Sequence, residues 1–289
     1  MRPAPQRPTV DRPGIQAGGA PTAIAATIAF RCPNCRLPLV AGDSRFWCAA
    51  GHAFDRAREG YVNLARTGRK RSRPAGDDAE MLRARRAFLD QGHYAPVIDA
   101  VADAIAATHP ASLLESGCGE GTYLAAATTT AAAAGGSPIS AWGIDIAKPA
   151  VALAARRHTG ATFAVASAFD LPFDDQVFDV ALSVFAPRAY EELKRVARIV
   201  VTASPGPDHL DGVRRLVYAA PRPHQPRPHA FDADRRVRFT LSLSDPDEVT
   251  NLLHMTPYWW QAPPSVRESM PDRLETTVDV VIATVQFAK

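Results

Sequence analysis

The stretch ASLLESGCGEGTYL, residues 111–124, decides the fold. Its apolar start suits a buried strand, which ends at three glycines, Gly117, Gly119 and Gly121, directly before a helical pattern. Glycine lets the main chain approach a ligand closely, and the N-terminus of a helix offers free N–H groups. The order of strand, glycine turn and helix predicts a nucleotide-type site in an α/β fold. The alternatives at this point are a Rossmann dinucleotide site and a tight turn without a ligand.

Strands and helices alternate along the chain on both sides of this stretch. The expected strands are 111–117, 141–146, 162–167, 177–185 and 198–204, with helices between them at 121–134, 148–158 and 189–197. Helices at 77–94 and 95–109 precede this set, and a helix at 209–218, a strand at 235–243, a helix at 245–255 and a strand at 276–287 follow it. Such alternation predicts a parallel sheet with helices on both faces, here closed by a final antiparallel hairpin.

Two acids favour S-adenosylmethionine over NAD as the ligand. Asp145 ends the second strand, where a carboxylate can accept hydrogen bonds from both hydroxyls of a ribose. Glu115 comes just before the glycines, where it can face the positively charged methionine part, whereas a pyrophosphate would be repelled there. The glycine spacing G-x-G-x-G, rather than G-x-G-x-x-G, points the same way.

The stretch SAFDLPFDDQVFD, residues 167–179, resembles the corresponding stretch of class I methyltransferases. In those enzymes the loop after the third strand lies along the adenine. Many of them have an acid where this chain has Ser167. The resemblance therefore implies that Ser167 or main-chain atoms contact the adenine here.

Three of the four cysteines lie in one short segment, with the spacing Cys32-x2-Cys35-x12-Cys48-x3-His52. Two ligands on a tight turn, a short loop and two further ligands predict a tetrahedral Cys3His zinc site. Four protein ligands leave no open position, so the zinc would be structural. The alternative is a redox CxxC pair, which would not need Cys48 and His52.

Charge is unevenly distributed over the 289 residues, although the net charge is only +3. Residues 1–100 carry a net charge of +7 and residues 101–289 a net charge of −4. A basic front half suggests a polyanion as partner, and the alternative is a solvated linker. No apolar run reaches the roughly 18 residues of a membrane span. Clustered cysteines suit a reducing compartment, so we expect a cytoplasmic protein without membrane contact.

From Phe30 to about Trp260 the chain resembles one family. The matching segments include CPNC (32–35), GHAFDRAREGYVNL (51–64), GCGEGTY (117–123), GIDIAKPAV (143–151) and LLHMTPYWW (252–260). They are similar to the bacterial large-subunit (23S) rRNA (guanine-N1)-methyltransferases of the RlmA type. The resemblance implies a class I (Rossmann-like) methyltransferase sheet with an N-terminal zinc-binding module, S-adenosylmethionine and one structural zinc. It also implies methylation of guanine N1 in a stem-loop near the peptide exit tunnel, a homodimer and, in some members, macrolide resistance.

The resemblance also implies a set of site residues, and composition adds a division of the chain, because residues 1–29 are rich in Pro, Ala and Gly. The expected parts are a disordered leader (1–29), a zinc-binding, basic RNA-contacting module (30–76) and a methyltransferase domain (77–289). The cofactor residues implied by the matching motifs are Tyr94, Gly117, Gly119, Gly121, Tyr123, Leu124, Asp145 and His209. From their charge, Arg69, Lys70, Arg71 and Arg73, near the end of the zinc-binding module, are expected to bind RNA phosphates.

The segment SVFAPR, residues 183–188, ends the fourth expected strand, where class I enzymes place residues that face the methyl acceptor. Phe185 can stack on a base, Pro187 can shape the wall and Arg188 can hold a phosphate or the base. None of these three is a good general base. Asp170 and Glu120 are more simply read as surface acids, so no general base is assigned.

One departure from the family concerns the segment KRVARIVVTASPG, residues 194–206, which lacks the family's PGG turn between helix and strand. This departure keeps open a non-catalytic RNA- or ribosome-binding protein with a degenerate methyltransferase fold. A methyltransferase for small molecules is a third hypothesis. The basic front half argues against a small-molecule methyltransferase, because a small acceptor does not require a surface that binds a polyanion.

Overall fold

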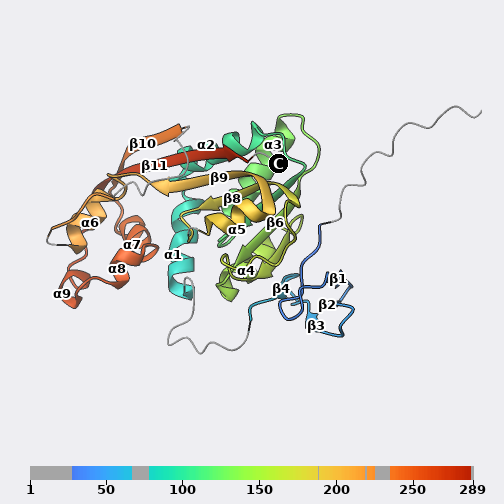
Figure 1. Cartoon of the computed structure of the whole chain (residues 1–289). Coiled ribbons are helices and arrows are strands. Elements are labelled where there is room, and N and C mark those ends of the chain that lie inside the picture. Colours follow the sequence, from blue (N-terminus) through green and yellow to red (C-terminus); the bar gives the residue numbers. More distant parts are fainter. Residues whose placement is uncertain (1–27, 67–77, 188, 219, 225–234, 288–289) are drawn as a thin grey trace, which may run out of the picture.

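The computed structural model describes residues 28–66, 78–187, 189–218, 220–224 and 235–287. Its main element is an eight-stranded sheet (Figure 1). The strands are β4 (Val62–Asn63), β5 (Ser112–Ser116), β6 (Ser140–Asp145), β7 (Thr162–Val165), β8 (Phe178–Val184), β9 (Ala197–Pro205), β10 (Arg235–Leu243) and β11 (Leu274–Gln286). Their order across the sheet is β10-β11-β9-β8-β5-β6-β7-β4. β4 to β9 run parallel, and β11 lies antiparallel between β9 and β10.

Helices cover both faces of this sheet, as the alternation predicts. They are α1 (Ala79–Asp90), α2 (Ala95–Ala106), α3 (Thr122–Ala133), α4 (Lys148–Arg157), α5 (Tyr190–Val196), α6 (Asp211–Val217), α7 (Pro246–His254), α8 (Pro257–Trp260) and α9 (Pro264–Arg267). Two successive residues of β5 show the layering, because neighbouring side chains of a strand point to opposite faces. Leu113 belongs to the apolar cluster that includes α2, α3 and α4, and Leu114 belongs to the cluster that includes α5.

The N-terminal module consists of a small antiparallel sheet and one further strand, which forms part of the main sheet. The small sheet contains β1 (Val40–Ala41), β2 (Arg45–Trp47) and β3 (Ala53–Asp55). β4 then lies parallel to β7 at the edge of the main sheet, with Val62 opposite Ala164. The buried ring of Phe30 contacts Phe46 of the small sheet and Trp142 of β6, with centroids 5.8 and 4.9 Å away. The module and the main sheet therefore share one apolar core.

The predicted strands and helices are confirmed, and their ends shift by only a few residues. The closing antiparallel hairpin is also confirmed, as β10 and β11. The short helices α8 and α9 and the pairing of β4 with β7 were not predicted. Most of the expected leader lies outside the described residues. Among the described residues, no helix is both long enough and apolar enough to cross a membrane.

The missing turn before the fifth predicted strand has a local replacement. α5 ends at Val196 and β9 begins at Ala197, without a connecting residue. The side-chain amide of Gln176, from the loop before β8, shares its two N–H groups among the carbonyl oxygens of Lys194, Arg195 and Ala197 at 2.8, 3.3 and 3.2 Å, and its backbone N–H donates to Arg195 at 2.8 Å. The end of the helix leaves carbonyl groups without helical partners, and Gln176 satisfies them across the junction.

Candidate active site and metal centre

A cavity of about 860 Å³ opens at the carboxyl ends of the parallel strands. Ligands of open α/β sheets bind at this edge. Most of the predicted cofactor residues and two acceptor-side candidates line it: Tyr94, Glu115, Gly117, Gly119, Tyr123, Asp145, Ser167, Phe185, Pro187 and His209. Gly121 and Leu124 lie directly behind the wall, at the start of α3. Arg188 lies outside the described residues.

The glycine turn has a main-chain shape that requires glycine. Gly117, Gly119 and Gly121 have φ values of 78°, 54° and 83°, in the left-handed region that L side chains rarely adopt. A Cβ atom on Gly117 would lie 2.4 Å from Cβ of Ala186. The turn therefore brings β5 close to the residues that follow β8, and this close approach forms one wall of the cavity.

Asp145 fixes the turn through both carboxylate oxygens. Its Oδ2 accepts a hydrogen bond from the backbone N–H of Gly119 at 2.9 Å, and its Oδ1 accepts from Ala147 at 2.8 Å. Asp145 thus holds the turn and also lines the cavity, at the end of the strand next to β5.

Glu115 is an acid kept away from water, with only 1% of its surface exposed. Its Oε2 accepts a hydrogen bond from the backbone N–H of Leu124 at 3.0 Å. Burial raises the pKa of Glu115 well above its usual value, and the nearby Asp145 adds to that rise. A positive charge beside a buried carboxyl group stabilises its ionised form. The part of the cavity around Glu115 therefore favours a positively charged ligand group.

Part of the cavity wall is aromatic, at the end of β8, the strand that pairs with β5. Phe185 follows β8 with a φ of 50°, remains 41% exposed and stacks on the His209 ring at 5.3 Å with an interplanar angle of 25°. The hydroxyl of Tyr94 lies 3.4 Å from Nε2 of His209. Sparsely populated backbone conformations on exposed aromatic residues are typical of functional sites. The structure therefore groups His209 and Tyr94 with Phe185, the acceptor-side candidate.

The protonation state of His209 follows from its contacts. Its Nδ1 accepts a hydrogen bond from the backbone N–H of Asp279 at 3.2 Å, so the ring proton is on Nε2. Burial lowers the pKa of His209 to about 4, and the neighbouring His224 contributes to that shift. Burial likewise raises the pKa of Tyr94. Both groups are neutral hydrogen-bonding side chains at ordinary pH.

Several lining residues had no signal in the sequence. Thr202 and Ser204 come from β9, and His224, Thr256 and Tyr258 come from the segments before β10 and after α7. The hydroxyl of Tyr258 lies 2.8 Å from Nε2 of His224. Only the similarity of LLHMTPYWW to the family pointed towards this wall. These residues are contributed by tertiary packing, which no local pattern encodes.

The two acids considered as bases differ in their positions. Glu120 lines the cavity, is 3% exposed and pairs with Arg157 at 3.3 Å, while its Oε1 has no hydrogen-bond partner among the described residues. Asp170 is not a lining residue and pairs with Arg36 and Arg66 of the N-terminal module. Reading Glu120 as a surface acid is wrong, because it is buried beside the glycine turn.

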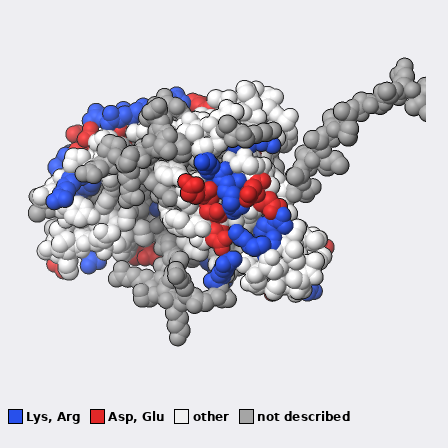
Figure 2. Space-filling view, in the orientation of Figure 1, with Lys and Arg blue, Asp and Glu red and all other residues white. Residues whose placement is uncertain are grey.

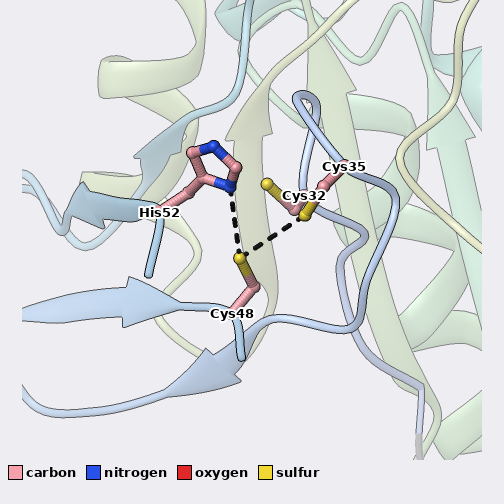
Figure 3. A group of neighbouring side chains, drawn as sticks. All are labelled: Cys32, Cys35, Cys48 and His52. Atoms are coloured by element: carbon pink, nitrogen blue, oxygen red, sulfur yellow. Dashed lines mark hydrogen bonds between the residues drawn. The ribbon is translucent and has the colours of Figure 1, made fainter. Parts of the chain in front are cut away.

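The four predicted zinc ligands converge (Figure 3). The Sγ atoms of Cys32, Cys35 and Cys48 and a ring nitrogen of His52 all lie within 4.8 Å of one another. Cys48 Sγ lies 3.6 Å from Cys35 Sγ and 3.5 Å from Nδ1 of His52. A tetrahedral zinc with Zn–S bonds of about 2.3 Å separates its ligands by about 3.8 Å, which these distances match closely.

The chemistry of the donor set also fits zinc. Burial tends to raise the pKa of the Cys48 thiol, but hydrogen bonds from His52 and from neighbouring groups lower it to about 6. A thiolate is the form that binds a metal. The three sulfurs and one imidazole leave no place for a water ligand, so a zinc bound here would serve the fold of the module.

Comparison with known proteins gives the same two parts. Residues 30–73 match the zinc-ribbon family described as RlmA, N-terminal, and residues 113–202 match a methyltransferase domain family. A protein of Streptomyces fradiae named 23S rRNA (guanine(748)-N(1))-methyltransferase is 38% identical over 253 residues, which cover 81% of this chain and 87% of that protein. YxjB of Bacillus subtilis (strain 168) is 32% identical over 279 residues, covering 88% of this chain and 96% of that protein. Its name provisionally gives it the guanine-N1 activity on 23S rRNA.

The cavity and the Cys3His cluster thus occur in a chain with close relatives over most of its length. The methyltransferase fold implies S-adenosylmethionine as cofactor, and the ribbon implies zinc. We conclude that the chain belongs to the zinc-ribbon family of S-adenosylmethionine-dependent 23S rRNA (guanine-N1)-methyltransferases.

Proposed function

We propose that this protein transfers the methyl group of S-adenosylmethionine to N1 of a guanine in a 23S rRNA stem-loop near the peptide exit tunnel. One observation supports this most: a single cavity is lined both by the buried acid Glu115 and by the exposed aromatic residue Phe185. The S. fradiae relative is named for guanine 748, so that guanine is the first target to test. In some members of the family the same methylation gives macrolide resistance, and we extend that proposal to this chain.

The cofactor end would receive S-adenosylmethionine through residues already in place. Asp145 would accept hydrogen bonds from the ribose, and Ser167 would contact the adenine. Glu115 would lie opposite the positively charged methionine part, where its buried carboxylate gains an ionic partner. When bound, the cofactor supplies a methyl group on a sulfonium, and the surrounding protein excludes water from that bond.

The acceptor end would receive a guanine turned out of its loop. Phe185 would stack on the base, as aromatic residues do for unstacked RNA bases, and Pro187 would shape the wall. Guanine N1 carries a proton at neutral pH, so a base must accept it. His209 is not available for that role, because its Nε2 carries the proton and its Nδ1 is bound to the backbone of Asp279. His209 and Tyr94 would instead orient the reactants as hydrogen-bond donors.

The N-terminal part would hold the RNA. We propose a division into a zinc-binding, RNA-contacting module (30–76) and a methyltransferase domain (77–289), with β4 as the strand that connects them. The expected phosphate ligands, Arg69, Lys70, Arg71 and Arg73, lie outside the described residues. We also propose that the protein forms a homodimer, which would place two such modules along one RNA. Light scattering of the purified protein measures whether the dimer forms.

The decisive experiment is methylation of defined RNA. The purified protein is incubated with labelled S-adenosylmethionine and a 23S rRNA hairpin that contains guanine 748, and the product is mapped by mass spectrometry. We expect 1-methylguanine, and no incorporation in a hairpin with adenine at that position. Methylation of another guanine in whole 23S rRNA would support the proposed reaction but show that guanine 748 is not the target.

The same experiment separates the alternative functions. Cofactor binding without methylation of any rRNA would support a non-catalytic RNA-binding protein with this fold. Methylation of small acceptors without RNA would support the third hypothesis. Macrolide sensitivity of cells with and without the protein tests the resistance proposal separately.

A further inference from the structure

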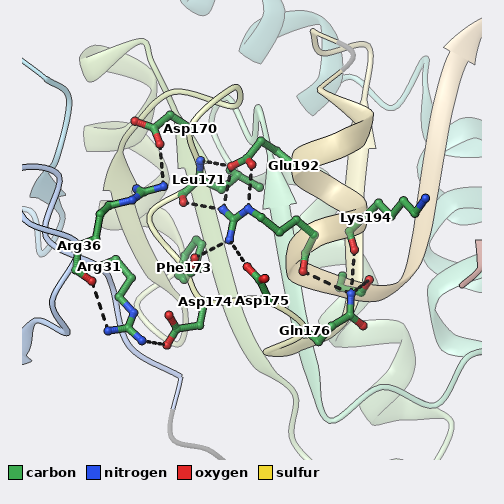
Figure 4. A network of polar contacts seen from close by, with 12 residues as sticks. Arg31, Arg36, Asp170, Leu171, Phe173, Asp174, Asp175, Gln176, Glu192 and Lys194 are labelled. Carbon is green, nitrogen blue, oxygen red and sulfur yellow. Dashed lines mark hydrogen bonds and ion pairs between the residues drawn. The ribbon is translucent and has the colours of Figure 1, made fainter. Parts of the chain in front are cut away.

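The loop formed by residues 167–176 connects β7 to β8 and contacts three different parts of the protein. Its first residues, Ser167, Ala168 and Phe169, line the cavity. Residues 170–174 contact the zinc ribbon, and residues 171–176 contact α5 from the other side (Figure 4). We call this segment the 167–176 loop.

The ribbon grips the loop next to two of the zinc ligands. Arg36 follows Cys35 in the metal-binding turn, has a φ of 63°, and its N–H donates to the carbonyl oxygen of Cys32 at 2.8 Å. Its guanidinium pairs with Oδ1 of Asp170 at 2.9 Å. Arg66, beyond β4, pairs with Oδ2 of the same carboxylate at 3.4 Å. The turn that carries two sulfur ligands is therefore bonded directly to the loop.

A main-chain contact and an aromatic contact strengthen this junction. The N–H of Arg31 donates to the carbonyl oxygen of Pro172 at 2.7 Å, and its guanidinium pairs with Asp174. The ring of Phe30 packs on Phe173 with centroids 5.3 Å apart. Figure 2 shows Lys and Arg beside Asp and Glu on the surface where the ribbon meets the rest of the protein, rather than a patch of a single charge. These contacts fasten the ribbon to the loop over several consecutive residues.

α5 holds the opposite side of the loop. Arg195 donates to the carbonyl oxygens of Phe173 and Leu171 at 2.8 and 3.0 Å, and Glu192 accepts from the N–H of Leu171 at 2.7 Å. Asp170 lies three residues after Ser167, and its N–H donates to the Ser167 carbonyl oxygen at 3.1 Å. A movement of Asp170 would therefore shift the residues that line the adenine end of the cavity.

We propose that the zinc-loaded ribbon positions the 167–176 loop for the cofactor, so that zinc and S-adenosylmethionine bind cooperatively. This inference rests on the proposed sites for the two ligands. A ribbon of this size depends on its metal for a fixed shape, so metal loss releases Arg36 and the loop with it. The cofactor must then order the loop itself and binds more weakly. Reciprocity requires the cofactor to tighten zinc binding by the same factor.

The expected size of this effect is modest. The ion pairs of Asp170 are partly exposed, and such pairs contribute little individually. The main-chain bond to Pro172 and the packing of Phe30 add to them. We expect zinc removal to weaken the binding of S-adenosylhomocysteine, the product left by the cofactor after methyl transfer, by about three- to tenfold.

The first test uses the full-length protein with and without zinc. Calorimetry measures the affinity for S-adenosylhomocysteine, and competition with a chelator measures the affinity for zinc with and without S-adenosylhomocysteine. The inference expects both affinities to change by the same factor. Equal S-adenosylhomocysteine affinities with and without zinc overturn it. Failure of the parent protein to bind zinc or S-adenosylhomocysteine at all overturns the proposed function and the inference together.

A second test keeps the zinc in place, which covers the case in which the metal-free protein unfolds. Asp170→Asn removes the two ion pairs that Asp170 makes with Arg36 and Arg66, and Asp175→Asn is the matched control, because Asp175 lies on the same loop but pairs with Arg195 of α5. We expect the Asp170→Asn protein to retain one zinc per chain and to bind S-adenosylhomocysteine severalfold more weakly. Removing zinc from this variant should change its affinity for S-adenosylhomocysteine less than it does in the parent. The control should stay within about twofold of the parent in both measurements. An Asp170→Asn protein that matches the parent in both overturns the inference.

Discussion

The backbone N–H of Asp279 donates a hydrogen bond to Nδ1 of His209 at 3.2 Å. This bond joins the last strand of the sheet to the loop after β9, and both residues are buried. It sets the tautomer of a histidine that lines the candidate active site. His224, Arg214 and the carboxylate of Asp279 also influence its charge, but burial is the largest cause of its lowered pKa.

The buried His209 should make stability depend on acid pH. Its pKa is about 4 in the folded protein and 6.5 ordinarily, so between these values the unfolded chain binds more protons. Stability is therefore lost as pH falls from about 6.5 to 4, by up to about 3 kcal/mol. Urea unfolding across this range should show a steeper loss for the parent than for His209→Gln, which cannot titrate. Parallel pH curves for the two proteins would contradict the assignment.

Asp145→Ala should weaken binding of S-adenosylmethionine. Removing hydrogen bonds between the ribose and a charged group costs about 1.5 to 3 kcal/mol, or about 10- to 150-fold in affinity. Calorimetry provides the measurement, and RNA affinity should stay unchanged. Because Asp145 also holds Gly119 and Ala147, urea unfolding must accompany it. Asp145→Asn, which keeps one acceptor oxygen, should fall between parent and Ala; unchanged affinity in both variants would place the ribose elsewhere.

Cys48→Ser should remove the zinc and lower the stability of the whole protein. The serine hydroxyl is a poor zinc ligand, and the ribbon shares Phe30 and β4 with the main sheet. Metal analysis should give one zinc per chain in the parent and close to none in the variant, and the urea midpoint should fall. Cys118→Ser is the control, since Cys118 is buried apart from the cluster. A Cys48→Ser protein that retains stoichiometric zinc would refute the ligand set.

Gln176→Ala should destabilise the junction of α5 and β9. The side chain donates to three carbonyl oxygens where the chain has no turn, and removing these bonds should lower the unfolding free energy by about 1 to 2 kcal/mol. Urea denaturation measures the change. Gln176→Glu is similar in shape but has no side-chain donor, so it should be destabilised at least as much. If the alanine variant kept the parent's stability, the capping role would be wrong.

The basic stretch should contribute to RNA binding by neutralising phosphates. Changing Arg69, Lys70, Arg71 and Arg73 to Ala should flatten the dependence of log affinity on log salt, by a little under one for each phosphate that is no longer neutralised. Filter binding of the rRNA hairpin across a salt series provides the measurement. Substituting Lys for the three arginines keeps the charge and should keep the slope. Equal slopes in the alanine variant and the parent would identify the stretch as a solvated linker.

Local patterns were sufficient to predict the parallel strands and the cofactor end. An apolar run followed by glycines predicts β5 and its turn, and an acid at the end of the next strand predicts Asp145. Cysteine spacing predicts the metal cluster for the same reason, because its ligands lie on two tight turns. Each of these features is encoded within a few consecutive residues.

The remaining parts depend on contacts between distant segments. Tyr94 and His209 meet although they are 115 positions apart, and Arg36 meets Asp170 across the ribbon boundary. No periodicity indicates such pairs, since each residue alone reads as an ordinary polar side chain. The two-residue strand β4 is too short for a pattern of its own, so its place in the main sheet could not be predicted.

The pairing of β4 with β7 has a consequence for the order of folding during synthesis. Val62 leaves the ribosome about a hundred residues before its partner Ala164. The ribbon can therefore acquire its metal while its sheet partner does not yet exist, and docking must wait for β5 to β7. Contacts of such long range form slowly. A nascent ribbon would thus spend that interval without the cover that Trp142 and Phe173 give to Phe30, and that Ala164 gives to Val62, in the folded protein.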